Sequence, residues 1–364
     1  MIPFEEEENE NPRLSLYNSI ARAAFDFHQG DIELPRPMSI DEVRRIYHFV
    51  MYDYPEIFWI KDSFRYSYNP ANKMVTSLTM SFRYEKADGT LDAALIKRYR
   101  KEIRESVGYF TKGITKKTSP YKALLTVYRR VVLAFDYDHE GLKRQKSGLG
   151  PGQNVEDELR TLHSALARHK VVCTGYAVAM QYLLQSVGIC CGQVVSETHS
   201  WNVVKIGGHV YHLDATWGDH SGEQNKDKVF YDYFCITSGE NRRDGAVRVP
   251  DPKLFAGLDN FTAQKYEYFR YHNAYLTRYD EATIARILAD GILRKEPCIG
   301  FRCSSKTLYD TVYSRLQGGR IGALETQVRA IVAAKNKRLA KQVRFAKWVP
   351  NSNQYTVYFV ECLK

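Results

Sequence analysis

The sequence predicts a mixed α+β protein organised around residues 170–219. Two observations predict this fold class. Apolar residues at helical spacing follow Cys173 and stop at Gly188, a residue type that favours the left-handed end of a helix. Two alternating runs then meet across Gly207-Gly208, a pair typical of a two-residue hairpin turn. The sequence therefore predicts a cysteine-bearing helix packed on an antiparallel sheet, with an N-terminal α+β region before it and a small C-terminal α/β unit after it.

The first 112 residues divide into two parts. Residues 1–16 are acidic, carry no apolar run and are expected to form a flexible N-terminus. Residues 17–112 form the N-terminal α+β region, in which Ser39 caps a first helix and the runs SFRYSYN and MVTSLTMSFRY are strands. A long helix follows, with a buried apolar stripe and a basic outer face. For that face we favour an ordinary solvated surface over the alternative, a phosphate-binding site. That basic face consists of Lys97, Arg98, Arg100, Lys101 and Arg104.

Residues 113–254 form the expected core domain, and residues 255–364 form a C-terminal α/β accessory domain. The core domain opens on a helix from Ser119-Pro120 to near Phe135. Residues 138–153 are rich in glycine and lack a hydrophobic period, which predicts either a mobile loop beside the site or a plain surface excursion. The accessory domain combines helices with short strands, of which KQVRFAKW and QYTVYFVEC are the last two.

The register of the hairpin decides which side chains meet. If Gly207-Gly208 is the two-residue loop, one face of the ribbon carries alternate residues of both strands, and His199 and Asp214 are diagonal neighbours on it. Diagonal Cα atoms lie roughly 7–8 Å apart, which lets an imidazole N–H reach a carboxylate. A loop of odd length would place the two residues on opposite faces. The face predicted here consists of His199, Trp201, Val203, His212, Asp214 and Thr216.

Cys173, His199 and Asp214 are residue types that act together in acyl transfer. A thiol is nucleophilic as the thiolate, and the unsatisfied N–H groups of a first helical turn, where Cys173 stands, lower the pKa of a thiol. An imidazole takes the thiol proton and later protonates a leaving amine, while a carboxylate on the other ring nitrogen fixes the tautomer. Each residue alone has an ordinary structural explanation, but their joint placement predicts a thiol triad.

Three motif blocks in fixed order also carry a family resemblance. VCTGYA, HSWNVV and VYHLDATWGD are preceded by SPYKALLTVYRRVVLAFDYD and followed by YDYFCITSGE. This stretch, residues 119–240, resembles the bacterial transglutaminase-like family of the papain-like cysteine superfamily. The resemblance implies a papain-like, transglutaminase-like core with Cys173 as nucleophile, His199 as general base and acid, and Asp214 as the partner that orients His199.

The resemblance leaves the reaction open, because members of this family include protein cross-linkers, amide hydrolases and peptidases. We expect a thiol-dependent acyl-transfer enzyme, either a transglutaminase, an amidase or a peptidase, that acts on amide bonds of proteins or peptides. Water or an amine would accept the acyl group. The segment HSALARHKVVC departs from the Gly-containing approach usual in the family, so no side chain is assigned as oxyanion donor. The backbone N–H of Cys173 is one candidate for that role.

Composition and charge narrow the partners. With 44% hydrophobic and 26% charged residues, the 364-residue chain has an ordinary globular composition, and its net charge of +10 permits anionic partners. No secretory signal opens the chain and no run of about 18 apolar residues is present, so we expect a cytoplasmic protein without membrane or nucleic-acid partners. Seven cysteines, an odd number, argue against a disulfide framework. Cys190 and Cys191 are expected to be buried strand residues.

Two other functions remain open at this point. A binding or scaffold protein could retain the fold without turnover and use the C-terminal tail or the basic helix as its contact surface. A metal site could draw on His199, His209, His212 and Asp214, but the register places His209 on the opposite face from His212, which weakens this alternative. We therefore expect neither a metal nor a cofactor.

Overall fold

The computed structural model describes residues 11–147, 159–219, 227–255, 257–258 and 260–363, and it has the mixed α+β class that the sequence predicts. The chain divides into two compact units. The first unit comprises Met1–Val127, Phe135–Asn202 and Pro250–Leu258, and the second comprises Tyr128–Ala134, Val203–Val249 and Asp259–Lys364. Two of the unit boundaries fall inside helix α4 (Pro120–Ala134) and strand β7 (Ser200–Ile206). No helix in the described ranges is long and apolar enough to cross a membrane.

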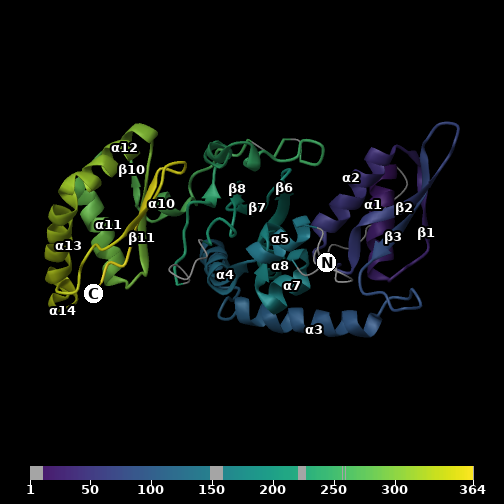
Figure 1. Cartoon of the computed structure of the whole chain (residues 1–364), viewed down its shortest axis with the longest axis horizontal. Coiled ribbons are helices and arrows are strands. Elements are labelled where there is room, and N and C mark those ends of the chain that lie inside the picture. Colours follow the sequence, from purple (N-terminus) through teal and green to yellow (C-terminus); the bar gives the residue numbers. More distant parts are fainter. Residues whose placement is uncertain (1–10, 148–158, 220–226, 256, 259, 364) are drawn as a thin grey trace. The chain divides into compact units, whose positions relative to one another are not determined.

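The first unit opens with a three-stranded antiparallel sheet in the order β1-β3-β2. Trp59 is fully buried beside it, and its indole N–H donates to the Ala24 carbonyl at 2.9 Å, which ties the start of β2 to helix α1. Helices α1 and α2 lie on the same side of the sheet (Figure 1). The elements are α1 (Pro12–Phe25), β1 (Asp31–Met38), α2 (Ile40–Asp53), β2 (Ile60–Tyr68) and β3 (Val75–Phe82).

Two of these elements differ from the sequence-based expectation. Helix α1 begins at Pro12, inside the segment 1–16 that was expected to be flexible, because Asn11 caps the helix by accepting a hydrogen bond from the Arg13 N–H. Strand β1 was not expected, since it contains two prolines. Proline is tolerated there because β1 is an edge strand of the sheet. The predicted Ser39 cap of α2 is confirmed, with Ser39 Oγ accepting from the Glu42 N–H.

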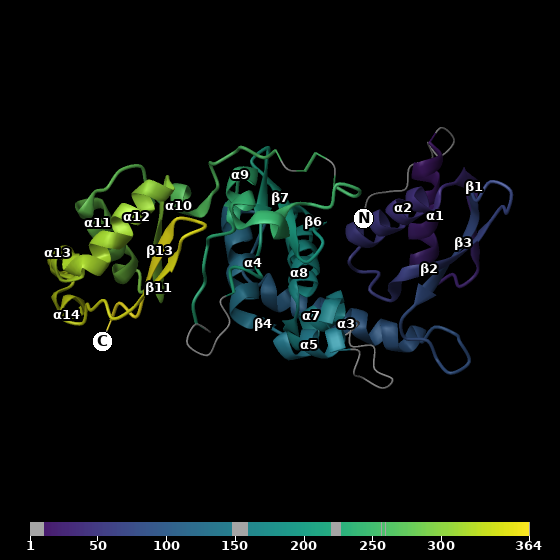
Figure 2. The same cartoon turned by 45° about the horizontal axis from the view of Figure 1, so that its top comes forward.

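The remainder of the first unit is mainly helical. The long helix α3 lies beside α7 (Figures 1 and 2), and the Ser106 hydroxyl of α3 donates to the Leu166 carbonyl of α7 at 2.7 Å. The elements are α3 (Ala93–Phe110), α4 (Pro120–Ala134, which continues into the second unit), β4 (Asp136–Tyr137), α5 (His139–Ser147), α7 (Leu162–Arg168), β5 (Lys170–Val171), α8 (Cys173–Ser186), β6 (Cys190–Val195) and the start of β7 (Ser200–Ile206).

Helix α3 has the two faces that the sequence predicts. Ile96, Ile103 and Phe110 of the apolar stripe are buried, while the five basic residues of the outer face are exposed. Arg98 forms an ion pair with Glu102 one turn later, at 3.8 Å, with both side chains largely in solvent. Such exposed pairs contribute little stability.

Two expectations on this unit need correction. The segment 138–153 was expected to be a loop, but its described part forms helix α5 from His139 to Ser147, and residues 148–153 lie outside the described ranges. The helix holds because the Asp138 side chain accepts from the Gly141 N–H at its start. Cys190 and Cys191 were both expected to be buried, but Cys190 is exposed, because neighbouring strand residues point to opposite faces.

The second unit confirms the predicted hairpin loop. Gly207 and Gly208 alone connect β7 to β8 (His209–Leu213), and both have positive φ, 57° and 82°. A two-residue hairpin turn with positive φ at both positions is one that glycine forms without steric cost. β8 pairs antiparallel with β9 (Phe234–Ile236), so that His212 faces Ile236.

The C-terminal part of the second unit is a mixed sheet in the order β10-β11-β13-β12, in which β10 and β11 are parallel and the other pairs antiparallel. α11 packs on β11, and α13 packs on α11. The predicted strand at 341–348 is wrong in position, since β12 starts only at Trp348. The elements are β10 (Tyr275–Leu276), α11 (Glu281–Leu293), β11 (Cys298–Cys303), α12 (Lys306–Arg315), α13 (Ile321–Lys335), α14 (Lys337–Ala340), β12 (Trp348–Asn351) and β13 (Thr356–Val360).

Buried charges connect this sheet to the short helices before it. The fully buried Arg302 of β11 lies 3.1 Å from Glu267 and 3.5 Å from Glu240, at the nearest nitrogen and oxygen atoms. Glu240 also completes a capping box with Thr237 at the start of α9 (Ser238–Asn241). Glu267 caps α10 (Tyr268–Tyr271) by accepting from the Arg270 N–H. These carboxylates therefore fix the helix starts and neutralise a buried guanidinium.

Candidate active site

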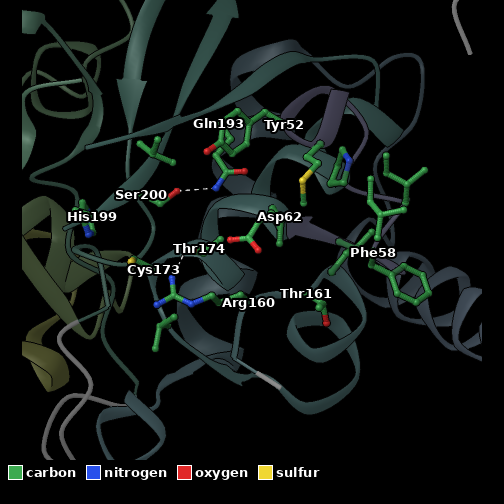
Figure 3. A pocket seen from close by; sticks show the side chains of 18 of the residues that line it. Tyr52, Phe58, Asp62, Arg160, Thr161, Cys173, Thr174, Gln193, His199 and Ser200 are labelled. Carbon is green, nitrogen blue, oxygen red and sulfur yellow. Dashed lines mark hydrogen bonds between the residues drawn. The ribbon is translucent and has the colours of Figure 1, made fainter. Parts of the chain in front are cut away.

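A pocket of about 530 Å³ in the first unit contains two of the three residues predicted as catalytic, Cys173 and His199. Its wall is formed by the start of α8, the end of β6 with the turn before β7, and residues 51–62 around the start of β2. Figure 3 shows Cys173 and His199 beside one another, with Arg160 and Thr174 next to the cysteine. A reacting group that enters this pocket therefore meets the thiol directly.

Cys173 is the first residue of α8, as the sequence predicts. Val172, the N-cap residue, makes no side-chain capping bond, so the backbone N–H groups of the first turn have no capping side chain as acceptor. Gly175 lets this turn lie close to β5, because a Cβ built there would be 2.5 Å from the Val171 Cβ and 3.0 Å from the Leu159 carbonyl oxygen. The sequence Cys-Thr-Gly thus places a thiol at the positive end of a helix that approaches its neighbours closely.

His199 is held by the turn that precedes β7. Its backbone N–H donates to the Ser196 hydroxyl at 3.1 Å, and its carbonyl accepts from the Ser196 N–H at 2.9 Å. The imidazole stacks on the indole of Trp201, with ring centroids 5.9 Å apart and an interplanar angle of 15°. The two rings lie on the same face, as expected for residues two apart in an extended segment. These contacts limit the orientations that the imidazole can adopt.

The thiol of Cys173 and the imidazole of His199 form a hydrogen bond. Burial raises the pKa of the thiol, but the hydrogen bond and charge of His199, a backbone hydrogen bond with Ser200 and the charge of Arg160 lower it. The net effect holds the pKa of Cys173 below the usual value of a thiol. This combination of an adjacent imidazole and a helix N-terminus is the environment that produces reactive thiolates.

Other buried cysteines show the opposite effect. Burial raises the pKa of Cys303 and of Cys362 to about 12, and burial with nearby acidic groups also raises the pKa of Cys298. These thiols have apolar or acidic surroundings and remain protonated at neutral pH. Cys173 is equally enclosed, with 7% of its surface exposed, so its specific neighbours and not its exposure distinguish it.

Asp214, the third predicted residue, belongs to the second unit, where it follows β8. Its side chain is 2% exposed, and one carboxylate oxygen, Oδ1, accepts from the Trp217 N–H at 3.1 Å. The other oxygen, Oδ2, lies 2.7 Å from Nη1 of Arg248. The carboxylate is thus buried, oriented by its own turn and paired with a cation.

Sequence reasoning did not single out several residues around these positions. Arg160 lies beside the thiol, and Arg248 pairs with Asp214. Asn202 donates its side-chain N–H to the Ala177 carbonyl at 2.9 Å, which fixes the start of β7 against α8. Gln193 donates to the Ser200 hydroxyl at 2.8 Å beside the same strand. Arg160, Gln193 and Arg248 lie in no motif or period of the sequence, and Asn202 lies in the HSWNVV block, where nothing in the pattern indicated its contact with α8.

The histidines of the hairpin have separate roles. His209 is exposed at the start of β8, whereas His212 is buried and bonded through Nε2 to the Ser238 hydroxyl at 3.0 Å. Burial, with the charges of Arg248 and Arg242, lowers the pKa of His212 to about 3. Across the described residues, no group of three or more His, Cys, Asp or Glu side chains is placed to hold a metal ion.

Comparison with known proteins identifies no family. No protein-family model and no curated protein matches the chain. Among solved structures, one described as a crystal structure of a TGase is 15% identical over 45% of each chain, with a TM-score of 0.31. Menin, whose structure is described as revealing the binding site for Mixed Lineage Leukemia protein, is 14% identical over 69% of this chain and 59% of its own, with a TM-score of 0.25. The chain covers less than two thirds of either structure, and likenesses this low show neither a shared family nor a shared activity.

Proposed function

We propose that this protein is a thiol-dependent acyl-transfer enzyme with a transglutaminase-like core, which acts on amide bonds of proteins or peptides. The observation that supports this function best is the hydrogen bond between His199 and the thiol of Cys173, the first residue of α8, together with the lowered pKa of that thiol. A pocket of about 530 Å³ opens onto both groups. An activated thiol that a substrate can reach is the first requirement of acyl transfer.

In the first half of the reaction, His199 takes the proton of Cys173. The thiolate attacks the amide carbonyl carbon, the C–S bond forms, and the C=O π electrons move to the oxygen. When that oxyanion collapses, the C–N bond breaks and the imidazolium of His199 protonates the leaving nitrogen, which departs as ammonia or an amine. A thioester on Cys173 remains.

In the second half, water or an amine attacks the thioester. His199 accepts a proton from the attacking group, the C–S bond breaks, and the thiol of Cys173 is restored when His199 returns that proton. Hydrolysis and transamidation share this acyl-enzyme and differ only in which acceptor reaches it. The uncapped N–H groups at the start of α8, including that of Cys173, would stabilise the oxyanion.

Asp214 would complete the triad as the carboxylate that orients the imidazole of His199. A carboxylate in this role remains ionised and stabilises the imidazolium that forms during the reaction. The positive charge of Arg248, 2.7 Å from the carboxylate, favours the ionised form that this role requires. Replacing Asp214 with asparagine would preserve the shape of the side chain and remove its charge. We expect a large loss of turnover, together with a loss of stability because Arg248 would keep a buried charge without its carboxylate.

The function is tested by the rate at which iodoacetamide labels each thiol at neutral pH, measured by mass spectrometry of peptides. We expect Cys173 to react faster than the exposed Cys190, and His199→Ala to slow labelling of Cys173 by about tenfold or more while leaving Cys190 unchanged. Equal rates at the two cysteines in the wild-type protein would instead support the alternative, a catalytically silent binding or scaffold protein. If Cys173 is the faster cysteine, incubation with a mixed peptide and amine library followed by mass spectrometry would identify the acyl group trapped on Cys173.

A further inference from the structure

We propose that Arg160 selects acyl donors that carry a carboxylate close to the scissile amide. The inference rests on the proposed function, because it assigns a substrate class to the same pocket. Arg160 lines the pocket together with Cys173 and Thr174, and Figure 3 shows its guanidinium beside both residues. It precedes α7, so it comes from a different element than the cysteine.

Two neutral groups hold the guanidinium of Arg160 in the pocket wall. Its Nη1 donates to the Thr174 hydroxyl at 3.0 Å, and its Nη2 donates to the Gln145 side-chain oxygen at 3.1 Å. These two bonds use two of the five N–H groups of an arginine. They fix the orientation of the side chain without neutralising its charge.

The charge of Arg160 has no carboxylate partner in the described part of the chain. Asp62 and Glu197 also line the pocket, but among the described residues neither lies within ion-pair distance of Arg160. The Nε–H is buried and has no acceptor among the described residues. Donors therefore outnumber acceptors around this guanidinium, and an incoming anion would correct both the charge and the hydrogen-bond deficit.

The position of this charge relative to the thiol defines the substrate class. Arg160 is close enough to Cys173 for its field to favour the thiolate, so an anionic group bound by Arg160 would lie near the reacting carbonyl. Arginine recognises carboxylates through paired N–H donors in a planar arrangement, which a neutral amide cannot match. The matching ligand is an acyl donor with a carboxylate near its reacting carbonyl, either an acidic side chain or a chain terminus.

Haloacetyl reagents test the selection without a known substrate. The thiolate attacks the CH2 carbon of iodoacetate and of iodoacetamide in the same way and displaces iodide, but only iodoacetate carries a carboxylate beside that carbon. The rate of each reagent at Cys173 is divided by its rate at the exposed Cys190 of the same molecule, which removes the intrinsic reactivity of the reagent. We expect this normalised rate to be about five- to tenfold higher for iodoacetate.

Three variants separate the charge of Arg160 from other effects. Arg160→Gln should remove the preference for iodoacetate, whereas Arg160→Lys should retain part of it, although both variants lose the guanidinium geometry. Arg98→Gln removes a positive charge from the exposed face of α3 and should leave the preference unchanged. Circular dichroism and thermal unfolding check that each variant is folded. If Arg160→Gln does not fold, Arg160→Lys still tests the preference.

The outcomes distinguish this inference from the function on which it rests. If His199→Ala slows both reagents at Cys173 but Arg160→Gln leaves their ratio unchanged, the selection by Arg160 is wrong and the activated thiol stands. If Cys173 is no more reactive than Cys190 toward any reagent, the proposed function itself fails. A preference for the cationic reagent 2-bromoethylamine would also overturn the selection, because Asp62 and Glu197 would then dominate the pocket. If the preference for iodoacetate is found, peptides with an acidic side chain and peptides with a free C-terminus would show which source of carboxylate is preferred.

Discussion

Arg248 and Asp214 form a buried ion pair in the second unit, with 2.7 Å between Nη1 and Oδ2 and side chains that are 0% and 2% exposed. The guanidinium carbon of Arg248 lies 3.9 Å from the ring centroid of Trp217 and 4.5 Å from that of Tyr233. Two aromatic faces and a carboxylate thus surround one cation. This arrangement holds the Asp214 carboxylate in one orientation and balances its charge.

Replacing Arg248 with methionine should destabilise the protein strongly. The substitution removes the cation paired with a buried carboxylate, and losses of about 3–5 kcal/mol are typical when one partner of a buried pair is removed. Urea unfolding measures the change. Arg294→Met is the matched control, because its ion pair with Glu296 has the same chemistry at 2.8 Å but an exposed arginine. We expect the control to lose less than about 1 kcal/mol, and equal losses in both variants would contradict this account.

Replacing Gly175 with alanine should both destabilise the protein and slow alkylation of Cys173. The new Cβ would lie 2.5 Å from the Val171 Cβ, so the first turn of α8 must move away from β5, at a cost of about 1–3 kcal/mol. Gly108 provides the control, since it lies in helix α3 with nothing within 4 Å of an added Cβ. Gly108→Ala should stabilise the protein by about 0.5 kcal/mol, because alanine is the better helix former. A harmless Gly175→Ala would show that the close approach is not required.

His212 should make stability depend on pH below neutrality. Its pKa is lowered from 6.5 to about 3 in the folded state, by burial and by the charges of Arg248 and Arg242. The folded protein therefore favours the neutral form of the His212 imidazole. The stability that this provides is fully present above pH 6.5 and is lost as the pH falls from 6.5 toward 3. At pH 5 the loss is about 2 kcal/mol. Urea unfolding at pH 7 and pH 5 should show a smaller pH effect in His212→Gln, and an unchanged effect would assign it to other groups.

Substitutions at Gly208 should report the turn conformation of the hairpin. Gly208 has a φ of 82° and nothing within 4 Å of an added Cβ, so backbone strain alone determines the effect. Gly208→Val should cost about 1–2 kcal/mol, whereas Gly208→Asn should cost less, because asparagine tolerates positive φ. Thermal unfolding of the two variants gives the comparison. A valine variant as stable as the asparagine variant would mean that the turn adopts another conformation in solution.

Elements with strong local signals were predicted correctly. The helix from Cys173 ends as expected, with Gly188 at a φ of 80°, and the Gly207-Gly208 turn has the length that the alternating runs indicated. Turn residues and helix stops act over a few residues, so the sequence records them directly. β1 was missed because its two prolines conceal a strand that forms by pairing with the distant β3. α5 was missed because it lies in a polar segment without a hydrophobic period.

The sequence by itself determined the local setting of the two groups that we propose to be catalytic: a thiol at a helix start and a histidine at a strand start, both signalled by local periodicity. Only the tertiary structure decided which charges surround them. Arg160 reaches the thiol from the segment before α7, and Arg248 reaches Asp214 from a separate helical segment. Ion-pair partners are chosen by distance in space, and a single arginine leaves no period or motif in the chain. For this reason the placement of the thiol and the imidazole on their elements could be predicted, whereas the charges around them had to be observed.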